Sequence, residues 1–301
     1  MSADSTTKKM GFLVSSLVVA YDAGINTFDT ANVYSNGLSE VVLGKAIKEF
    51  NLPRDEIVVM TKVFSVVGRE PNVSFFGSPD GPDASGYVNQ HGLSRKHIFD
   101  SVKHSLERLQ LDYIDVLQCH RFDNNTPIEE TMQALHDVVK AGYVRYIGMS
   151  SCWAWQFHAM QNYAIQNNLT PFISMQNHYS LVYREEEREM FPTLKVKPRS
   201  QNHTERQSSR WNTFIKSYHN DATTAIVDRV EEISKKRSVS MAQLALVWSD
   251  IQLAGVTAPI VGTTSLENLR ELIAAVDIEL TQDEIKYLEE PYKPTSIIGH
   301  T

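Results

Sequence analysis

The chain has 301 residues, 42% hydrophobic and 22% charged, so it carries enough apolar side chains for one large core. With 36 acidic against 29 basic residues the net charge is −7, which argues against nucleic acid as a partner because phosphate binding needs clustered Lys and Arg. No run of 18 apolar residues occurs, which excludes a transmembrane helix and predicts no membrane partner. The two cysteines, Cys119 and Cys152, are too few for a disulfide framework and fit a reducing compartment, so we expect a cytoplasmic protein.

The first apolar segment allows two interpretations. Lys8 and Lys9 precede an apolar run from Gly11 to Ala20, which is the order of the charged and apolar regions of a signal peptide. The run continues into Tyr21-Asp22-Ala23-Gly24, a sequence typical of a helix end closed by glycine. We therefore favour an apolar helix packed on the core over a signal peptide.

Short β-rich runs alternate with helical patterns from residue 25 to residue 176. The strand candidates are largely apolar, as buried parallel strands are, and the helix candidates repeat apolar residues every three or four positions. The predicted strands are Ile25–Phe28, Ile57–Val63, Tyr113–Cys119, Val144–Met149 and Phe172–Gln176. The predicted helices are Glu40–Glu49, a helix capped by Ser94 with Ile98, Val102, Leu106 and Leu109 on one face, Ile128–Ala141 and Trp153–Asn167.

Two long polar segments interrupt this pattern. Val67–Gly92 is rich in glycine and has no period, so we expect a loop that borders the substrate pocket. Lys195–Ser209 is polar without β character and also predicts a loop, within an atypical insertion or loop region at 193–222. Around it the sequence predicts a short charged helix at Arg184–Met190, helices at Thr223–Lys236, Ser240–Trp248 and Ser265–Val276, a strand at Ala258–Val261, and a last helix that begins with a capping box at Thr281–Glu284.

Strands separated by helices of about 10 to 15 residues indicate βαβ units and a parallel sheet. A parallel sheet of this kind is either a closed (β/α)8 barrel or a doubly wound open sheet. No Gly-x-Gly-x-x-Gly follows the first strand, so the dinucleotide-binding fingerprint of the open sheet is missing. The missing fingerprint favours the closed, TIM-type barrel, so we expect an α/β protein in which one barrel domain takes up residues 1–301.

Four titratable residues fall where a parallel barrel places its reactive groups, at the carboxyl ends of strands. Asp29 directly follows the first predicted strand, Tyr34 lies in the loop just past it, Lys62 lies near the end of the second, and His120 follows the third. Each one taken singly is explained more simply as a cap, a surface charge or a structural histidine. Because they stand at successive strand ends, we expect them to converge on one site.

These four residue types together favour proton donation from a phenol. An isolated phenol has a pKa of about 10 and is a slow acid at neutral pH. A nearby ammonium favours the phenolate, and a carboxylate keeps that ammonium charged and oriented. A neutral imidazole can hold a carbonyl oxygen for attack. Tyr34, Lys62, Asp29 and His120 would supply these four parts.

The segment Gly24–Glu40, with the sequence GINTFDTANVYSNGLSE, resembles the signature of the aldo-keto reductases. Thr61-Lys62, Leu109–Asp115 and Cys119-His120 resemble the next blocks of that family in order, and the similarity runs from about Val19 to the C-terminus. The chain resembles in particular the aryl-alcohol-dehydrogenase-like branch, which includes reductases of fungal secondary metabolism. The resemblance implies a (β/α)8 barrel that reduces a small-molecule aldehyde or ketone to an alcohol, with Tyr34 as proton donor.

The same resemblance implies NADPH (NADP⁺) as the cofactor and assigns residues to its two ends. At the nicotinamide end, the residues that match the carboxamide contacts are Ser150, Ser151 and Gln176. At the adenosine end, the matching positions are Gly262, Thr264, Asn268 and Glu271. Pro259–Ser265 resembles the loop that binds the 2′-phosphate, and an anion there would face the N-terminus of the helix that begins near Ser265.

Three segments depart from the family pattern. Only 24 residues precede Ile25, so the first barrel strand is absent or replaced. Lys195–Ser209 lacks the apolar seventh strand, the aromatic residue that stacks on the nicotinamide and the Ser-Pro-Leu-like run that grips the pyrophosphate. Thr263-Thr264 stands where many relatives carry a basic residue. We therefore expect a barrel that is incomplete at strands 1 and 7.

Three functional interpretations follow. The chain is an active NADPH-dependent carbonyl reductase, an impaired relative with poor cofactor binding, or a non-catalytic regulatory subunit on the same fold; the fold does not choose among them. The four intact candidate residues favour the first two. We expect no metal site, since neither His-x-x-x-His nor Cys-x-x-Cys spacing occurs. We also expect no covalent cysteine chemistry, because Cys119 and His120 point to opposite faces of a strand.

Overall fold

A computed structural model describes residues 16–70, 73–75, 81–195, 201–204, 220–251, 256–263 and 265–300, with only the backbone at 201–204 and 250–251. The chain forms two compact units, Met1–Met175 with Gly299–Thr301 and Gln176–Ile298, and the boundary falls inside a strand. Within the described residues, no helix is both long enough and apolar enough to cross a bilayer.

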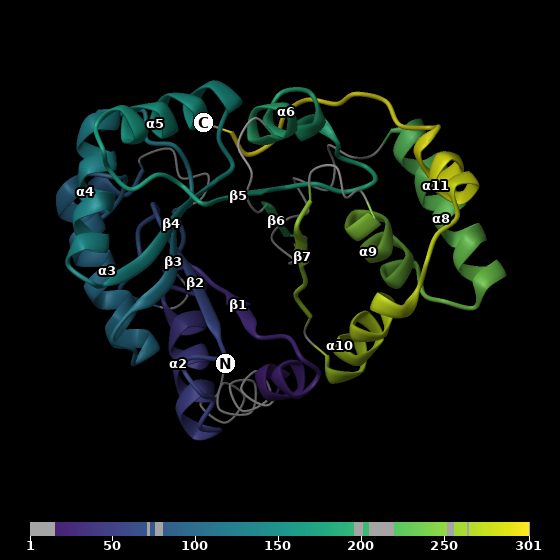
Figure 1. Cartoon of the computed structure of the whole chain (residues 1–301), viewed down its shortest axis with the longest axis horizontal. Helices are drawn as coiled ribbons and strands as arrows, with labels where there is room; N and C mark the ends of the chain where they lie inside the picture. The colour runs from purple at the N-terminus through teal and green to yellow at the C-terminus, as the bar shows by residue number, and fades with distance from the viewer. Residues whose placement is uncertain are drawn as a thin grey trace. The chain divides into compact units, whose positions relative to one another are not determined.

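The first unit alternates strand and helix, and its strands pair in parallel in chain order, β1 with β2, β2 with β3 and β3 with β4. Helices α3, α4 and α5 lie along one side of these strands (Figure 1). The elements are β1 (Thr27–Asp29), α2 (Leu38–Glu49), β2 (Val58–Val63), the 3₁₀ turn η1 (Asp83–Ser85), α3 (Arg95–Leu109), β3 (Ile114–Cys119), α4 (Ile128–Lys140), β4 (Val144–Ser150), α5 (Ala154–Gln166) and the start of β5 (Ser174–Asn177).

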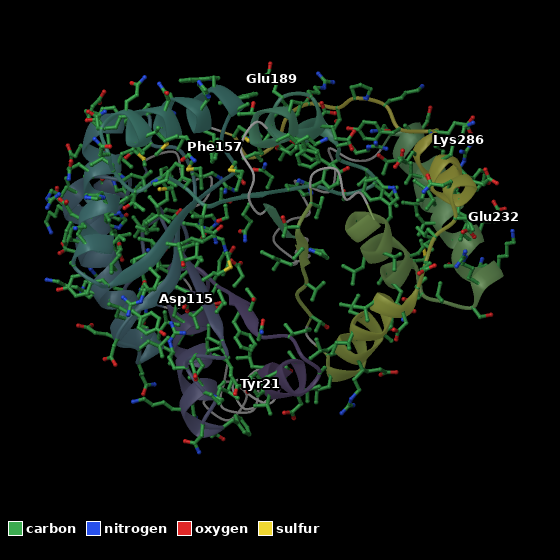
Figure 2. The ribbon with its side chains drawn as sticks, in the orientation of Figure 1. Tyr21, Asp115, Phe157, Glu189, Glu232 and Lys286 are labelled. Carbon is green, nitrogen blue, oxygen red and sulfur yellow. The ribbon has the colours of Figure 1, made fainter. Side chains whose placement is uncertain are left out.

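The helices of the first unit bury the faces that their sequence period predicts. On α3, Ile98, Val102 and Leu109 are fully buried, and Ser94 caps the helix by accepting a hydrogen bond from the His97 N–H at 3.3 Å. On β3, the Asp115 carboxylate accepts the Val59 N–H of β2 at 2.8 Å (Figure 2). These side chains fix the helices and strands that carry the candidate residues.

Residues 16–22 are helical, and Leu17 packs against Val42 and Ala46 of α2. Gly24 closes this helix with a φ of +94°, and its N–H donates to the Tyr21 carbonyl at 2.8 Å. The expectation of an apolar helix packed on the core is therefore confirmed for its described part; residues 11–15 of the run lie outside the described residues.

The second unit has its own apolar core, centred on Trp248 and Tyr179, whose rings stack at 5.5 Å. Its strands β6 and β7 pair in parallel. The elements after β5 are the 3₁₀ turn η2 (Glu185–Glu187), α6 (Met190–Lys195), β6 (Gln201–Thr204), α8 (Asp221–Arg237), α9 (Met241–Ile251), β7 (Ala258–Ile260), α10 (Leu266–Ile273), the 3₁₀ turn η4 (Ala274–Asp277) and α11 (Gln282–Glu289).

The predicted fold class, an α/β protein with the strand–helix alternation of an incomplete (β/α)8 barrel, is confirmed. No strand precedes β1 within residues 16–26, where the first barrel strand would end. The Lys195–Ser209 loop prediction is wrong at Gln201–Thr204, which forms the short strand β6. The helix predicted at Arg184–Met190 is also wrong, since η2 is a single 3₁₀ turn and the α-helix begins only at Met190.

Candidate active site

The four candidate residues of the sequence lie together at one edge of the first unit's sheet. Asp29 is the last residue of β1, Lys62 is the last but one of β2, and His120 directly follows β3. Because β1, β2 and β3 are adjacent and parallel, their carboxyl ends share one edge. Tyr34 lies in the loop between β1 and α2, at the same edge. The structure thus brings together the carboxylate, the ammonium, the phenol and the imidazole.

A buried ion pair joins Asp29 and Lys62. The Lys62 Nζ lies 2.5 Å from the Asp29 Oδ2, and the two side chains are 0% and 6% exposed. The ammonium also donates to the Thr30 carbonyl at 2.9 Å. Buried charges are costly unless they are paired and hydrogen-bonded, and this pair meets both conditions. The ammonium is thereby held in a fixed place at the strand edge.

Tyr34 lies near both this ammonium and the imidazole of His120. The Lys62 Nζ is 5.2 Å from the centroid of the Tyr34 ring, and the His120 ring meets the Tyr34 ring edge-on at 5.6 Å and 82°. An ammonium next to a phenol favours the negative phenolate that forms when the phenol gives up its proton. The arrangement can therefore donate a proton from Tyr34 to a group that lies beside His120.

His120 is held in its neutral form. Burial of the ring, together with the positive charges of Lys62 and Arg121, lowers the pKa of His120 well below its usual value. Its backbone N–H donates to the Val63 carbonyl at 3.0 Å, while its Nδ1 is buried without a partner among the described residues. A neutral imidazole is the form that can hydrogen-bond a carbonyl oxygen without taking up a proton at neutral pH.

The residues predicted to hold the nicotinamide amide are divided between the two units. Ser150 closes β4 and is 4% exposed, and its Oγ lies 3.4 Å from the Oγ of Ser151. Ser151 has a φ of +45°, a left-handed conformation that is strained for a residue other than glycine and is common at functional sites. Gln176 is buried in the part of β5 that belongs to the second unit.

The residues predicted for the adenosine end belong to the second unit. Ser265 caps α10, since its Oγ accepts the Asn268 N–H at 3.3 Å. Gly262 and Asn268 are exposed, and the carbonyl of Glu271 accepts from Gln243 of α9 at 2.8 Å. Thr264 lies outside the described residues.

The sequence pattern did not predict a glutamine that lies at the same edge as the four candidate residues. Gln118 is fully buried on β3, and its Nε2 donates to the Asp29 Oδ1 at 3.2 Å. One signal could have found it, because side chains two residues apart on a strand share a face, which places Gln118 on the same face as His120.

The last residues of the chain were also missed. His300 stacks on Trp153 at 5.0 Å and 29°, and burial lowers the pKa of His300 to about 4. Gly299 lies beside the guanidinium of Arg121, which directly follows His120. The tail of the chain therefore belongs to the surroundings of this site in the first unit, at the ends of β3 and β4.

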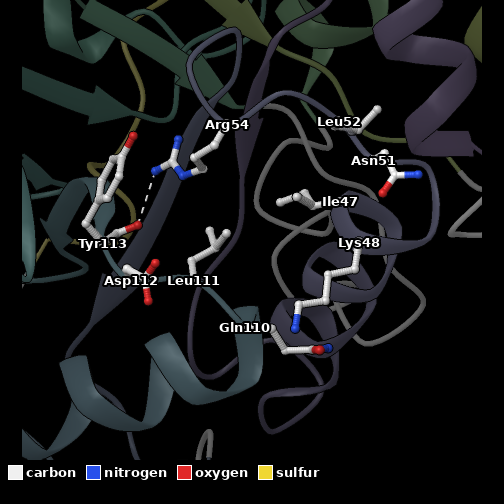
Figure 3. Close-up of a pocket in the computed structure, with 9 residues that line it drawn as sticks. All are labelled: Ile47, Lys48, Asn51, Leu52, Arg54, Gln110, Leu111, Asp112 and Tyr113. Atoms are coloured by element: carbon white, nitrogen blue, oxygen red, sulfur yellow. Dashed lines mark hydrogen bonds between the residues drawn. The ribbon is translucent and has the colours of Figure 1, made fainter.

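Two other features of the first unit lie apart from this chemistry. Burial raises the pKa of the Cys119 thiol to about 12, so the thiol stays protonated at neutral pH and is a poor nucleophile. An open cavity of about 520 Å³ lies between the segments that precede β2 and β3, at the opposite end of the strands from Tyr34 (Figure 3). The candidate residues do not line that cavity.

The sequence profile of the aldo/keto reductase family matches residues 4–293. The chain belongs to the aldo/keto reductase family. It is 47% identical to an aldo-keto reductase of Fusarium vanettenii over 95% of this chain and 82% of that protein.

Two further relatives carry more specific names. The chain is 43% identical to the versiconal hemiacetal acetate reductase of Aspergillus parasiticus, over 92% of this chain and 86% of that protein. It is 44% identical to a putative aryl-alcohol dehydrogenase of Schizosaccharomyces pombe, over 93% of this chain and 85% of that protein. The chain is thus an oxidoreductase by family, and this family acts on small carbonyl substrates.

Proposed function

We propose that this aldo/keto reductase uses NADPH to reduce an aldehyde or a ketone to the corresponding alcohol. The observation that carries the proposal is the buried ion pair of Asp29 and Lys62, with the Tyr34 ring near both the Lys62 ammonium and the imidazole of His120. Together these groups supply a proton and a hydrogen-bonding group for a carbonyl oxygen, which are the protein's share of a carbonyl reduction.

The residues at the catalytic edge fit the nicotinamide half of the cofactor. The adjacent hydroxyls of Ser150 and Ser151 can hydrogen-bond a carboxamide. We assign these two serines and Gln176 to the carboxamide, and Gly262, Thr264, Asn268 and Glu271 to the adenosine end. The bound cofactor supplies the hydride, and the protein holds its ring and the carbonyl carbon in reach of each other.

The side chains of the chain then have separate tasks. His120 orients the carbonyl oxygen through a hydrogen bond. Tyr34 gives its phenol proton to that oxygen, so the oxygen becomes a hydroxyl as the carbon is reduced. Lys62 stabilises the phenolate left behind, and Asp29 holds Lys62 in place.

For the substrate we propose an aromatic or polyketide-derived aldehyde or ketone, in a role in secondary metabolism. Two kinds of relative support this: one named a versiconal hemiacetal acetate reductase and several named aryl-alcohol dehydrogenases. Aromatic side chains also follow the strands that carry the site, with Phe122 and Trp155 at 6.1 Å after β3 and β4. Aromatic faces of this kind favour flat, apolar ligands.

The substitution Tyr34→Phe tests the proposal. We expect it to abolish NADPH-dependent reduction of aromatic aldehydes, because the phenyl ring has no proton to give, and to leave NADPH binding unchanged. Turnover is followed by the loss of NADPH absorbance, and binding by quenching of protein fluorescence with NADH as the comparison.

Tyr146→Phe is the matched control, since Tyr146 lies on β4 in the same unit and is 53% exposed. It should keep full turnover. Unchanged turnover in Tyr34→Phe would refute the assignment of the proton donor. A folded, monodisperse wild-type protein that binds no NADPH would favour the impaired relative instead.

A further inference from the structure

Gln118 occupies the middle of a row of side chains that crosses the sheet beside the site. In the parallel register Gln118 pairs with Lys62 of β2 on one side and with Gly148 of β4 on the other, so all three positions face the same way. This register therefore places Gln118 directly beside Lys62, the cation of the Asp29–Lys62 ion pair.

Gly148 leaves the space that this amide needs. A Cβ at position 148 would lie 3.2 Å from the Cγ of Gln118 and 2.4 Å from the Oγ of Ser174. A contact of 2.4 Å is closer than packed atoms tolerate, so a larger residue would displace its neighbours. Gly148 on β4 therefore leaves room for the side chain of Gln118.

The amide of Gln118 and the ammonium of Lys62 bond different oxygens of the Asp29 carboxylate. Lys62 Nζ lies 2.5 Å from Oδ2, and Gln118 Nε2 lies 3.2 Å from Oδ1. Donors on both oxygens help to fix the plane of the carboxylate.

The position of Gln118 also buries one of its hydrogen-bond acceptors. The Oε1 of Gln118 has no partner among the described residues, although the side chain is fully buried. An apolar residue of the same size would fill the same space without that cost, because an unpaired buried acceptor loses its hydrogen bonds to water. A break of this kind in an otherwise consistent core is typical of a residue kept for function.

We propose that Gln118 is a positioning residue of the reduction, which holds Asp29 and through it the ammonium of Lys62 at the place where that ammonium supports Tyr34. This inference rests on the proposed function. Gln118 acts through Asp29 and touches neither substrate nor cofactor in this scheme. The titratable groups that face it are Asp29 on β1, Lys62 on β2 and His120 after β3.

Two substitutions test the role. Gln118→Met keeps the size and removes the donor, so we expect kcat to fall about tenfold, the effect of one hydrogen bond to a charged group, with the KM for NADPH unchanged. The alkaline limb of the kcat profile should move to higher pH, because a less well-placed ammonium stabilises the phenolate less. Gln118→Glu can donate to Asp29 only while its new carboxyl is protonated. Its kcat should therefore approach the wild-type value at acidic pH and fall as that carboxyl ionises.

Gln161→Met is the matched control. The Gln161 amide bonds the backbone of Phe172 on both sides, at 2.8 and 3.1 Å, in the same unit but away from the site. It should lose stability without a change in the pH profile. If Gln118→Met and Gln118→Glu both give the wild-type pH profile and kcat, the positioning role is wrong and the proposed function stands. If the wild-type enzyme reduces no carbonyl compound, both proposals fall together.

Discussion

Asp29 in the first unit and the neighbouring pair Glu185 and Glu186 in the second are buried to a similar degree, but they face different partners. Asp29 faces the buried ammonium of Lys62 at 2.5 Å. Glu185 and Glu186 are 5% and 4% exposed and are adjacent on η2. Asp29 is thus paired with a buried cation, whereas Glu185 and Glu186 lie beside each other.

Glu185 and Glu186 in the second unit have different hydrogen-bond partners. Glu185 accepts the Tyr292 hydroxyl at 2.6 Å and the Thr295 N–H at 2.8 Å, and it contacts the half-exposed guanidinium of Arg188. Glu186 accepts a hydrogen bond from the amide of Asn177 at 3.0 Å. Burial, together with the charge of Glu185, raises the pKa of Glu186 to about 8. Burial and the neighbouring carboxylate thus both act against the ionised form of Glu186.

The largest effect is expected when the cation of Lys62 is removed. Lys62→Met leaves the Asp29 carboxylate buried without its partner, so we expect a loss of about 3–5 kcal/mol in the free energy of unfolding. Turnover should fall by roughly 10²–10⁴-fold, because the phenol then donates its proton unaided. Urea unfolding and NADPH consumption measure the two effects, with the exposed Lys45→Met as the control.

A double variant separates the two losses. Asp29→Asn with Lys62→Met removes both charges, so most of the unfolding free energy should return while turnover stays low. Turnover that returns in the double variant would show that the ammonium has no part in the proton transfer.

The next largest effect is expected at Glu186. Its pKa is raised from the usual 4.5 to about 8, so the folded protein holds this proton more tightly than the unfolded chain does. The contribution of this group to stability is therefore fully present below pH 4.5 and is lost as the pH rises towards 8. Glu186→Gln removes the titration and should be more stable than the wild type at pH 8.5, by a few kcal/mol at roughly 1.4 kcal/mol per pKa unit.

Urea unfolding at pH 5 and pH 8.5 tests this expectation. The wild type should lose more stability between the two pH values than Glu186→Gln does. Glu189→Gln, at an exposed position three residues further on, should behave as the wild type (Figure 2). Parallel pH dependences in all three proteins would contradict the assignment of the high pKa to Glu186.

The contrast between the two centres also separates what the sequence predicts from what it does not. Local signals predicted the helices and their caps, including the capping box of Thr281 and Glu284 that the structure confirms. They also placed Asp29 and Lys62 at strand ends, because strand ends are local features. They did not predict the contact of Gln118 with Asp29, which joins residues 89 positions apart and depends on strand register.

In the second unit, two segments formed other structures than their local sequence predicts. Gln201–Thr204 has no apolar alternation, and the strand there exists through backbone pairing with Ala258–Ile260. Glu185, Glu186 and Glu187 fit a charged helix by composition, but Glu185 and Glu186 are buried, and Glu185 bonds the distant Tyr292. Long-range pairing fixed both segments, and a local pattern does not record it.

The smallest effect is expected at Tyr292. Its hydroxyl donates to the Glu185 Oε1 at 2.6 Å and accepts the Arg184 N–H at 2.9 Å. Tyr292→Phe leaves both groups without this partner, so the free energy of unfolding should fall by about 1–2 kcal/mol.

Tyr287→Phe is a matched control, because the Tyr287 hydroxyl also donates to a glutamate, Glu232, at 2.7 Å, but at an exposed position. An exposed bond exchanges with water, so this variant should lose less than about 0.5 kcal/mol. Equal losses in the two variants would mean that Tyr292 adds no more to the buried carboxyl pair than a surface contact does. A larger loss in Tyr292→Phe would instead show that Glu185, which also contacts the guanidinium of Arg188, depends on a neutral hydrogen-bond donor as well as on a cation.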